Sequence, residues 1–576
     1  MHYFKSFISL LRFFETYFLL DFLIKIKSAL KNGITKLTFL IFFLTSTLSV
    51  MAQTSGAGPS SNYFIVSLIA VAVLILIAVV LMVSDNLMRI EAKQLGVDDS
   101  GANYSLFPKV NEIFSPKLPK YVNGDKVFFL KKGHNILLEG ESEGNVAEEA
   151  QVSTFGIQPP NFIGMSPIPK VVVEVGDVIK AGDILFFDKK RPEVKYASPV
   201  SGEVVAVNRG TKRSIAEVVV LKDKEMKYRK VASFDLEKGS REDLVQHLLE
   251  YGVWPMIQQR PYDVVAEPGD LPKNIFISTF DSAPLAPNNN IVVEGKGEAF
   301  QKGLDVLNML TEGKVFLGLS ANDDKAPSNV FTKAEGVVKN WFSGPHPSGN
   351  VGVQIHHSSP ICAGDKVWTL GVQEVITLGA LFTENRFNAE RVLALAGKEL
   401  DAPKYVKTYQ GANVGDLVKE NAAFENVRFI SGDVLSGHTK SESGFLNFFA
   451  DQLTVVKEGD YYEMFGWLLP LKPRPSISKT FPNFLFPDQK FTADTNSHGE
   501  RRAFVVTGQY ESVLPMDIYP QHLMKSIIVN DFERMEGLGI YELSEEDVAL
   551  CEFVCTSKQP LQKILREGLD VMREQG

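Results

Sequence analysis

The run VVVEVGDVIKAGDIL at residues 171–185 decides the fold of the first globular part of the chain. Its apolar and polar residues alternate up to Gly176-Asp177, and a second Gly-Asp pair follows at Gly182-Asp183. Alternation is typical of a half-buried strand, and Gly-Asp supplies the positive φ of a tight hairpin turn. Further on, ASPVSGEV at 197–204 turns and begins another strand. The two runs predict a small barrel of short strands built from two similar halves.

These halves resemble the two half-motifs of the biotinyl/lipoyl fold, so we assign residues 126–240 to a barrel-sandwich hybrid domain. Carrier domains of this type present a modified lysine on an exposed hairpin, usually within Met-Lys-Met. The corresponding segment, DKKRPE at 188–193, has Lys189 and Lys190 but no flanking methionine. We therefore expect a structural or docking barrel rather than a lipoyl or biotinyl carrier.

The N-terminal part of the chain is far more apolar than the rest. Residues 63–83 contain no charged side chain, and at 1.5 Å per residue they span about 32 Å, the thickness of a bilayer core. This predicts a transmembrane helix at 63–84. The shorter apolar run at 37–48 follows several lysines and ends near a small-residue site, so residues 1–52 are interpreted as a signal-like apolar segment.

The charges around these runs predict the orientation of the chain. Lysines such as Lys36 precede the first run, and Arg89 and Lys93 follow the second. Because basic residues favour the cytoplasmic side, the loop at 53–62 should lie outside and the globular body inside. Residues 85–125 carry proline and serine without periodicity and are predicted to be a linker.

Composition excludes several classes of function. The chain has 576 residues, a formal net charge of −9 and three cysteines. Its length predicts several domains. An acidic balance argues against a broad nucleic-acid surface, and so few cysteines exclude a disulfide scaffold.

The middle of the chain predicts a Rossmann-like α/β unit at 241–385. Apolar strand candidates lie at 274–280, 292–294 and 314–320, separated by turn or helix signals. From 391 to 432 the order is strand, hairpin, short helix and strand.

This order resembles a β-grasp domain of the soluble-ligand-binding type, which we place at 386–450. Residues 451–576 form the C-terminal domain, expected to be helical. Asp517 and the run SEED at 544–547 should begin helices with acidic first turns, which suits the helix dipole. The fold class is therefore a multidomain α/β protein.

Six short motifs in a fixed order identify a family. Together they resemble the A subunit of the bacterial sodium-translocating NADH:quinone reductase from about residue 127 to the C-terminus. The departure is the apolar first 125 residues, which the family's usual chain lacks. The motifs are FLKKGH at 129–134, FIGMSP at 162–167, FSGPHP at 342–347, FGW at 465–467, LPMDI at 514–518 and CEFVC at 551–555.

The resemblance implies a subunit of a complex that oxidises NADH, reduces quinone and exports sodium ions. In the family the NADH site, the flavins and the 2Fe–2S cluster belong to other subunits. This chain would bind none of these cofactors. Its partners would be five further subunits, above all the membrane subunit that carries covalent flavin, with a possible contact to quinone. The body would lie on the cytoplasmic side of the cytoplasmic membrane.

Related electron-input subunits, of the Rnf complex and of respiratory complex I, bind flavin and NADH on a glycine-rich loop. Here the corresponding segment, LEYGVWP at 249–255, has one glycine, too few for backbone amides to surround a phosphate. A second segment, IVVEGKGEAF at 291–300, offers Gly-x-Gly after a short strand. Phe300 replaces its third glycine, so an ordinary strand–turn–helix unit is predicted instead of a dinucleotide site.

The cysteines and histidines do not predict a metal centre. A 4Fe–4S cluster needs about four thiolates, more than the chain has. Cys551 and Cys555 share a helix face and are interpreted as buried thiols. His346 should lie in a loop, and His356 and His357 should point to opposite faces of a strand, so that too few ligands converge for zinc. The third cysteine is Cys362.

Two alternatives from other classes remain open. One is an Rnf-type electron-input subunit that binds NADH and flavin, against which the few cysteines count. The other is a membrane-anchored, lipoyl-like adaptor of an efflux system. Such adaptors place the barrel outside the cell and insert long heptad helices into it, whereas the basic residues here favour an inside body.

Overall fold

The computed structural model describes residues 71–73 and 76 and most of 118–575. The chain divides into two compact units, Met1–Leu118 and Pro119–Gly576. The predicted segments at 1–52 and 63–84 and the linker at 85–125 therefore lie almost entirely outside the described residues. Among the residues that are described, no helix is long and apolar enough to cross a membrane. The gaps after 118 are 123–125, 145, 147–148, 166–168, 420, 423–424, 465, 467–472, 478–482, 484–485, 487 and 505–507.

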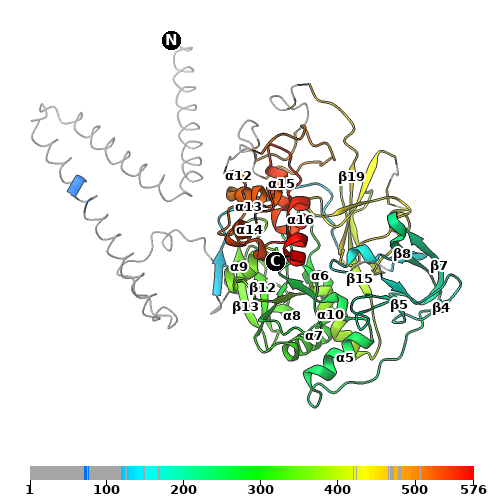
Figure 1. The fold of residues 1–576 in the computed structure, drawn as a ribbon. Helices are drawn as coiled ribbons and strands as arrows, with labels where there is room; N and C mark the ends of the chain where they lie inside the picture. The colour runs from blue at the N-terminus through cyan, green and yellow to red at the C-terminus, as the bar shows by residue number, and fades with distance from the viewer. Residues whose placement is uncertain are drawn as a thin grey trace, which may run out of the picture. The chain divides into compact units, whose positions relative to one another are not determined.

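The largest sheet described in the second unit has seven strands, of which β12 and β13 are labelled in Figure 1. The first five strands in this order are parallel. Strand β9 is antiparallel to its neighbour β14, and the last strand, β10, is antiparallel to β9. The strand order reverses between β11 and β14, as in doubly wound α/β folds. In spatial order the strands are β1 (Lys126–Phe129), β13 (Val338–Ser343), β12 (Lys314–Ser320), β11 (Asn274–Ser278), β14 (Val367–Thr369), β9 (Gln258–Arg260) and β10 (Val264–Val265).

Helices cover both faces of this sheet. Ile275 and Ile277 of β11 belong to the same core as α7, whereas Phe276 packs with Ile355 of α9. Because side chains alternate along a strand, α7 and α9 lie on opposite faces. The helices of this unit are α5 (Arg241–Glu250), α6 (Asn289–Val292), α7 (Gly297–Leu310), α8 (Asn329–Thr332), α9 (Val351–Ser358) and α10 (Val372–Thr383).

Helices α7 and α10 approach each other closely through glycine. A Cβ atom on Gly379 would lie 1.7 Å from the Ala299 carbonyl oxygen, and one on Gly303 would lie 2.2 Å from that of Val375. Any larger residue would force the two backbones apart, so both positions require glycine.

Two of the three predicted strands in this unit are confirmed, at 274–280 and 314–320. The strand predicted at 292–294 is wrong, because helix α6 occupies Asn289–Val292. The side chain of Asn288 caps this helix by accepting the N–H of Asn290, an interaction typical of a helix N-terminus. In addition, β1 pairs with β13 of the α/β sheet, although it lies in the range assigned to the barrel. Phe128 stacks on Phe342 at 5.0 Å between ring centroids.

The barrel-sandwich hybrid domain is present as two small sheets, on the right of Figure 1. The predicted hairpin at Gly176-Asp177 is wrong in its pairing. Strand β3 before it pairs with β5, whereas β4 after it pairs with β7, so the turn crosses from one sheet to the other. One sheet contains β2 (Thr154–Ile157), β8 (Ile215–Lys222), β7 (Gly202–Arg209) and β4 (Val178–Ile179); the other contains β3 (Lys170–Val171), β5 (Ile184–Phe187) and β6 (Lys195–Ala197).

A five-stranded sheet with one short helix follows, at the place predicted for the β-grasp domain. Its central strands β15 and β19 are parallel, and β19 lies beyond residue 450. The spatial order is β16 (Lys404–Tyr409), β15 (Glu390–Ala396), β19 (Gln452–Lys457), β17 (Val427–Ser431) and β18 (His438–Lys440), and the helix is α11 (Val414–Val418).

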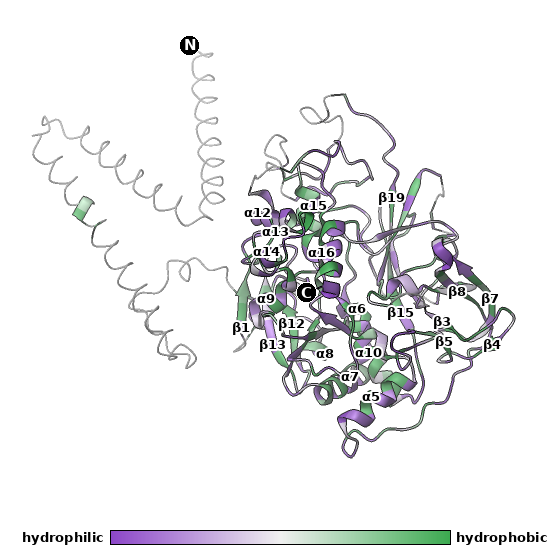
Figure 2. Ribbon diagram, viewed as in Figure 1, coloured by the Kyte–Doolittle hydropathy of each residue, from purple (hydrophilic) through white to green (hydrophobic). Residues whose placement is uncertain are grey.

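The C-terminal region is helical from Gln509 onward, as predicted, whereas strand β19 occupies Gln452–Lys457 of the range assigned to the C-terminal domain. Ser544 caps α15 in a capping box with Asp547, which confirms the acidic start predicted there. Helix α13 begins at Pro520 without an acid in its first turn, so Asp517 is not the predicted helix start. Helix α16 carries polar and apolar residues along its length (Figure 2). The helices are α12 (Gln509–Val513), α13 (Pro520–Ile528), α14 (Phe532–Gly537), α15 (Glu545–Val554) and α16 (Leu561–Gln575).

Candidate functional site

Open α/β sheets bind ligands outside the carboxyl ends of their strands, where the strand order reverses. In this chain that point lies between β11 and β14, and acidic residues are found there. Asp281 follows β11, and Glu374 lies in the first turn of α10 after β14. Arg391 of β15 bonds both Glu374 and Asp451, with 2.6 Å to the latter. The β-grasp domain is thereby held against the carboxyl edge of the sheet.

The electrostatics of this edge disfavour an anion. Partial desolvation and the charge of Asp433 raise the pKa of Asp281 to about 6. Asp281 accepts the N–H of Ala283 at 2.8 Å, and no cation pairs with it among the described residues. A flavin or nicotinamide phosphate placed here would meet carboxylates instead of a ring of backbone amides.

A second arginine attaches the C-terminal helices to the same sheet. Arg260 of β9 is 2% exposed. It donates to Asp547 at 2.9 Å, to Ser544 at 2.8 Å and to Glu546 at 3.0 Å, all at the N-terminus of α15. The sequence around Arg260 does not indicate these ion pairs, because the partners lie almost three hundred positions further along the chain.

The segment at 249–255, which corresponds to the glycine-rich loop of the relatives, is a packed junction between domains. Gly252 has φ +70°, and a Cβ atom on it would lie 2.9 Å from that of Ala197 in the barrel. Trp254 is fully buried, donates to the Ala266 carbonyl at 2.8 Å and packs edge-on against Trp368. The side chains that replace the glycines fill this space.

The Gly-x-Gly segment at 295–297 connects two helices. It follows α6 and begins α7, so the short strand expected before it is wrong. Lys296 within it pairs with Glu390 of β15 at 2.9 Å. The strand–loop–helix arrangement that binds a dinucleotide is therefore absent at this segment.

The barrel hairpin at 188–193 joins β5 to β6 and is fixed to the α/β domain. Arg191 donates to the buried carboxylate of Asp188 at 3.0 Å, to Glu267 at 3.0 Å and to the Val265 carbonyl at 3.2 Å. A carrier hairpin has to present its lysine freely to several partners, whereas this one is held in place.

The three cysteines lie in two different environments, two of them buried and one exposed. Cys551 and Cys555 are buried in the core of the C-terminal helices, where the Tyr510 hydroxyl lies 2.9 Å from the Cys555 sulfur. Burial, with the nearby charge of Glu511, raises the pKa of Cys551 and keeps its thiol protonated. Cys362 is exposed and lies after α9. Within the described part of the chain, no three His, Cys, Asp or Glu side chains are grouped to hold a metal ion.

The three histidines singled out in the sequence have different hydrogen-bond partners. His346 is 3% exposed, its Nδ1 lies 3.0 Å from the Ser282 hydroxyl, and burial lowers its pKa to about 4. His356 and His357 lie on helix α9, so the strand predicted there is wrong. His356 bonds Glu542 at 2.8 Å, and His357 bonds the Pro515 carbonyl at 2.7 Å.

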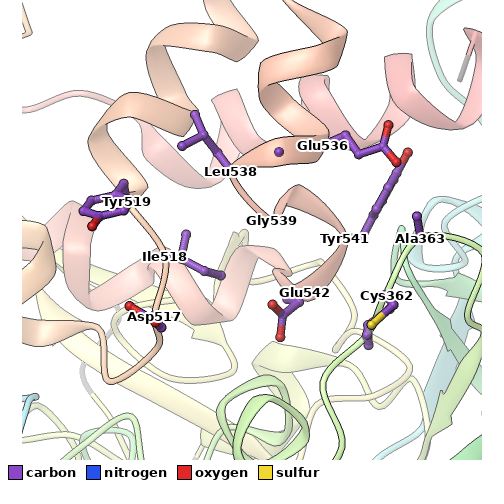
Figure 3. Close-up of a pocket in the computed structure, with 12 residues that line it drawn as sticks. Cys362, Ala363, Asp517, Ile518, Tyr519, Glu536, Leu538, Gly539, Tyr541 and Glu542 are labelled. Atoms are coloured by element: carbon purple, nitrogen blue, oxygen red, sulfur yellow. The ribbon is translucent and has the colours of Figure 1, made fainter. Parts of the chain in front are cut away.

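A pocket of about 400 Å³ lies next to His356, whose hydrogen-bond partners Glu542 and Asp517 line it (Figure 3). Three segments build it: the loop after α9, the LPMDI segment before α13, and the turn between α14 and the 3-10 helix Ile540–Glu542. The motif LPMDI is visible in the sequence only through the family resemblance, and the other two segments carry no sequence signal of a pocket. The pocket is lined by Ile361, Cys362, Ala363, Asp517, Ile518, Tyr519, Glu536, Gly537, Leu538, Gly539, Tyr541 and Glu542.

Comparisons with known proteins agree on one family. Residues 128–223 match the model of the NqrA N-terminal barrel-sandwich hybrid domain, residues 239–387 that of the NqrA second alpha/beta domain, and residues 392–442 that of the NQRA C-terminal domain. Among solved structures, an NAD+-reducing NiFe-hydrogenase in the air-oxidized state matches with a TM-score of 0.29 and 11% identity. The match covers 53% of this chain and 60% of that one.

Curated relatives named as the A subunit of the Na+-translocating NADH-quinone reductase match over 78% of this chain and 99% of their own length. The relative from Yersinia pestis biovar Antiqua is 36% identical over 450 residues. The relative from Cellvibrio japonicus is 37% identical over 452 residues.

Proposed function

Since the chain belongs to the family of A subunits of the Na+-translocating NADH:quinone reductase, we propose that it is the redox-cofactor-free subunit of such a complex. The complex oxidises NADH, reduces quinone and exports sodium ions. This subunit contributes surfaces for assembly, in contact with five other subunits and above all with the membrane subunit that carries covalent flavin. Contact with quinone belongs to the same proposal.

The carboxyl edge of the α/β sheet is the observation that carries the proposal. At the place where a Rossmann-like unit binds its nucleotide, the negative charge of Asp433 raises the pKa of Asp281. The ion pairs of Arg391 and Arg260 hold the β-grasp domain and the C-terminal helices against the α/β domain. The edge that binds a nucleotide in related folds is used here for contacts between domains. The role that remains for this globular part of the chain is to present surfaces to partner subunits. The fixed hairpin of the barrel supports the same conclusion.

The proposal also includes a membrane location. The helix expected at 63–84 would anchor the chain in the cytoplasmic membrane, with 53–62 outside and the globular body on the cytoplasmic side. Arg89 and Lys93 support this side through the preference of basic residues for the cytoplasm.

Copurification tests the proposal. A tag on the C-terminus of the full chain should isolate five further subunits from detergent-treated membranes, together with sodium-stimulated quinone reduction by NADH. An untagged strain is the control. Isolation of outer-membrane efflux components would establish the adaptor alternative. Isolation of the chain alone, with NADH oxidation of its own, would establish the Rnf-type alternative.

A further inference from the structure

The pocket beside α13 is lined by three carboxylates and by no lysine, arginine or histidine. Asp517 and Glu536 are exposed at its rim, and neither has an ion-pair partner in the described part of the chain. The third carboxylate, Glu542, is half-buried and bonds only His356 among charged or titratable groups described.

The bond to His356 leaves the charge of Glu542 uncompensated. Nε2 of His356 accepts the backbone N–H of Asp517 at 3.1 Å. The single proton of the ring is therefore on Nδ1, which donates to Glu542 at 2.8 Å. In this network the imidazole is neutral, so all three carboxylates contribute negative charge to the pocket.

Aromatic and apolar side chains complete the lining (Figure 3). Tyr541 and Tyr519 stand on opposite sides of the pocket in this view, with Ile518 and Leu538 between them. Carboxylates combined with aromatic rings favour a cation, which the carboxylates attract by charge and the ring faces by their quadrupole. A neutral quinone ring would gain nothing from the three uncompensated charges.

We propose that this pocket receives the side chain of an arginine or lysine that belongs to another subunit, an inference that rests on the proposed membership in a complex. The volume lies in the range of small ligand sites, roughly 300–1,000 Å³. A polypeptide is favoured over a free amine because exposed apolar residues lie at both ends of α13, with Tyr519 at the pocket and Ile528 and Val529 at the far end. Tyr519 is 61% exposed, Ile528 53% and Val529 70%, and exposed aromatic and apolar residues around a charged pocket are typical of protein interfaces.

Cys362 provides a reporter that needs no knowledge of the partner. It lines the pocket and is exposed, whereas Cys551 and Cys555 are buried and serve as internal controls. The experiment measures the rate at which iodoacetamide alkylates Cys362 in the full-length protein, by mass spectrometry. The probe is the capped peptide acetyl-Leu-Arg-Leu-amide, and its counterpart contains neutral citrulline in place of arginine.

The arginine peptide should slow the alkylation of Cys362 in a saturable way, and the citrulline peptide should need about tenfold higher concentration. Asp517→Asn and Glu536→Gln should each weaken protection by the arginine peptide about two- to fivefold, as expected for partly exposed ion pairs. The matched control is Glu533→Gln, since Glu533 is exposed on α14 but does not line the pocket; protection should stay unchanged.

Equal protection by the two peptides, or none by either, would overturn the proposal, and this comparison requires no variant to fold. Protection by short-chain ubiquinone that is insensitive to both substitutions would assign the pocket to quinone instead. In membranes, a benzophenone attached to Cys362 should cross-link a basic segment of another subunit. Failure of copurification would refute the membership of this chain in a complex. Failure of the peptide assay would refute only the binding of a basic side chain in this pocket.

Discussion

Replacing Arg260 with methionine should loosen the C-terminal helices from the α/β sheet. The arginine is 2% exposed, and the side chain of its partner Asp547 is fully buried. Removing one member of a buried pair costs roughly 3–5 kcal/mol, because the other charge stays buried without compensation. Asp547 keeps its bonds to Ser544, and Glu546 is 43% exposed and can be solvated. The lower figure, about 3 kcal/mol, is therefore expected.

Hydrogen exchange measures this cost locally, which suits a multidomain chain that does not unfold in two states. Amides of α15 and α16 should exchange roughly a hundredfold faster in Arg260→Met, as about 3 kcal/mol requires. Adding Asp547→Asn should recover most of this loss, since no buried charge is then left alone. The control, Arg534→Met, removes an arginine whose side chain is 76% exposed and should change little. Unchanged exchange in Arg260→Met, or a double variant worse than the single one, would refute the attachment through Arg260.

Two further predictions concern the acidic edge and the membrane topology. The pKa of Asp281 is raised to about 6, so its carboxylate destabilises the fold above pH 6. Asp281→Asn should therefore increase stability above about pH 6 by about 1 kcal/mol after allowance for solvent screening. Below about pH 4, where the carboxyl group is protonated in both the folded and the unfolded state, the substitution should change nothing. Amide hydrogen exchange near residue 281, compared between variant and parent at each pH from 4 to 8, would measure this locally, and a gain independent of pH would contradict it. A reporter active only in the periplasm should remain inactive when fused after residue 100, and activity would place the body outside.

Helices and strands were predicted correctly from the sequence where the signal lies within the element itself. Strand β12 occupies the predicted residues 314–320, and the acidic first turn of α15 was predicted from SEED at 544–547. The sequence did not distinguish helix from strand where the apolar run is only a few residues long. Val292 and Val293 have the composition of a strand, yet a cap from Asn288 makes this segment helical. His356 and His357 were placed on a strand for the same reason, since a short apolar run has no clear period.

Pairings distant in sequence could not be predicted. Strand β1 joins a partner more than two hundred residues later, and the turn at Gly176 joins two sheets instead of closing a hairpin. The pocket is assembled from three separate segments, of which only LPMDI had been singled out. One chain without related sequences offers no information on such contacts, because neither composition nor periodicity depends on them.

The central claim is that this subunit carries no redox cofactor of its own. The visible spectrum and iron content of the full-length chain, expressed without the other subunits and purified in detergent, test it most directly. No flavin band near about 450 nm and no stoichiometric iron should be found, because carboxylates and packed side chains occupy the places where a phosphate cradle would lie, and the three cysteines are too few for a 4Fe–4S cluster. About one flavin per chain, or iron in stoichiometric amount, would contradict the account.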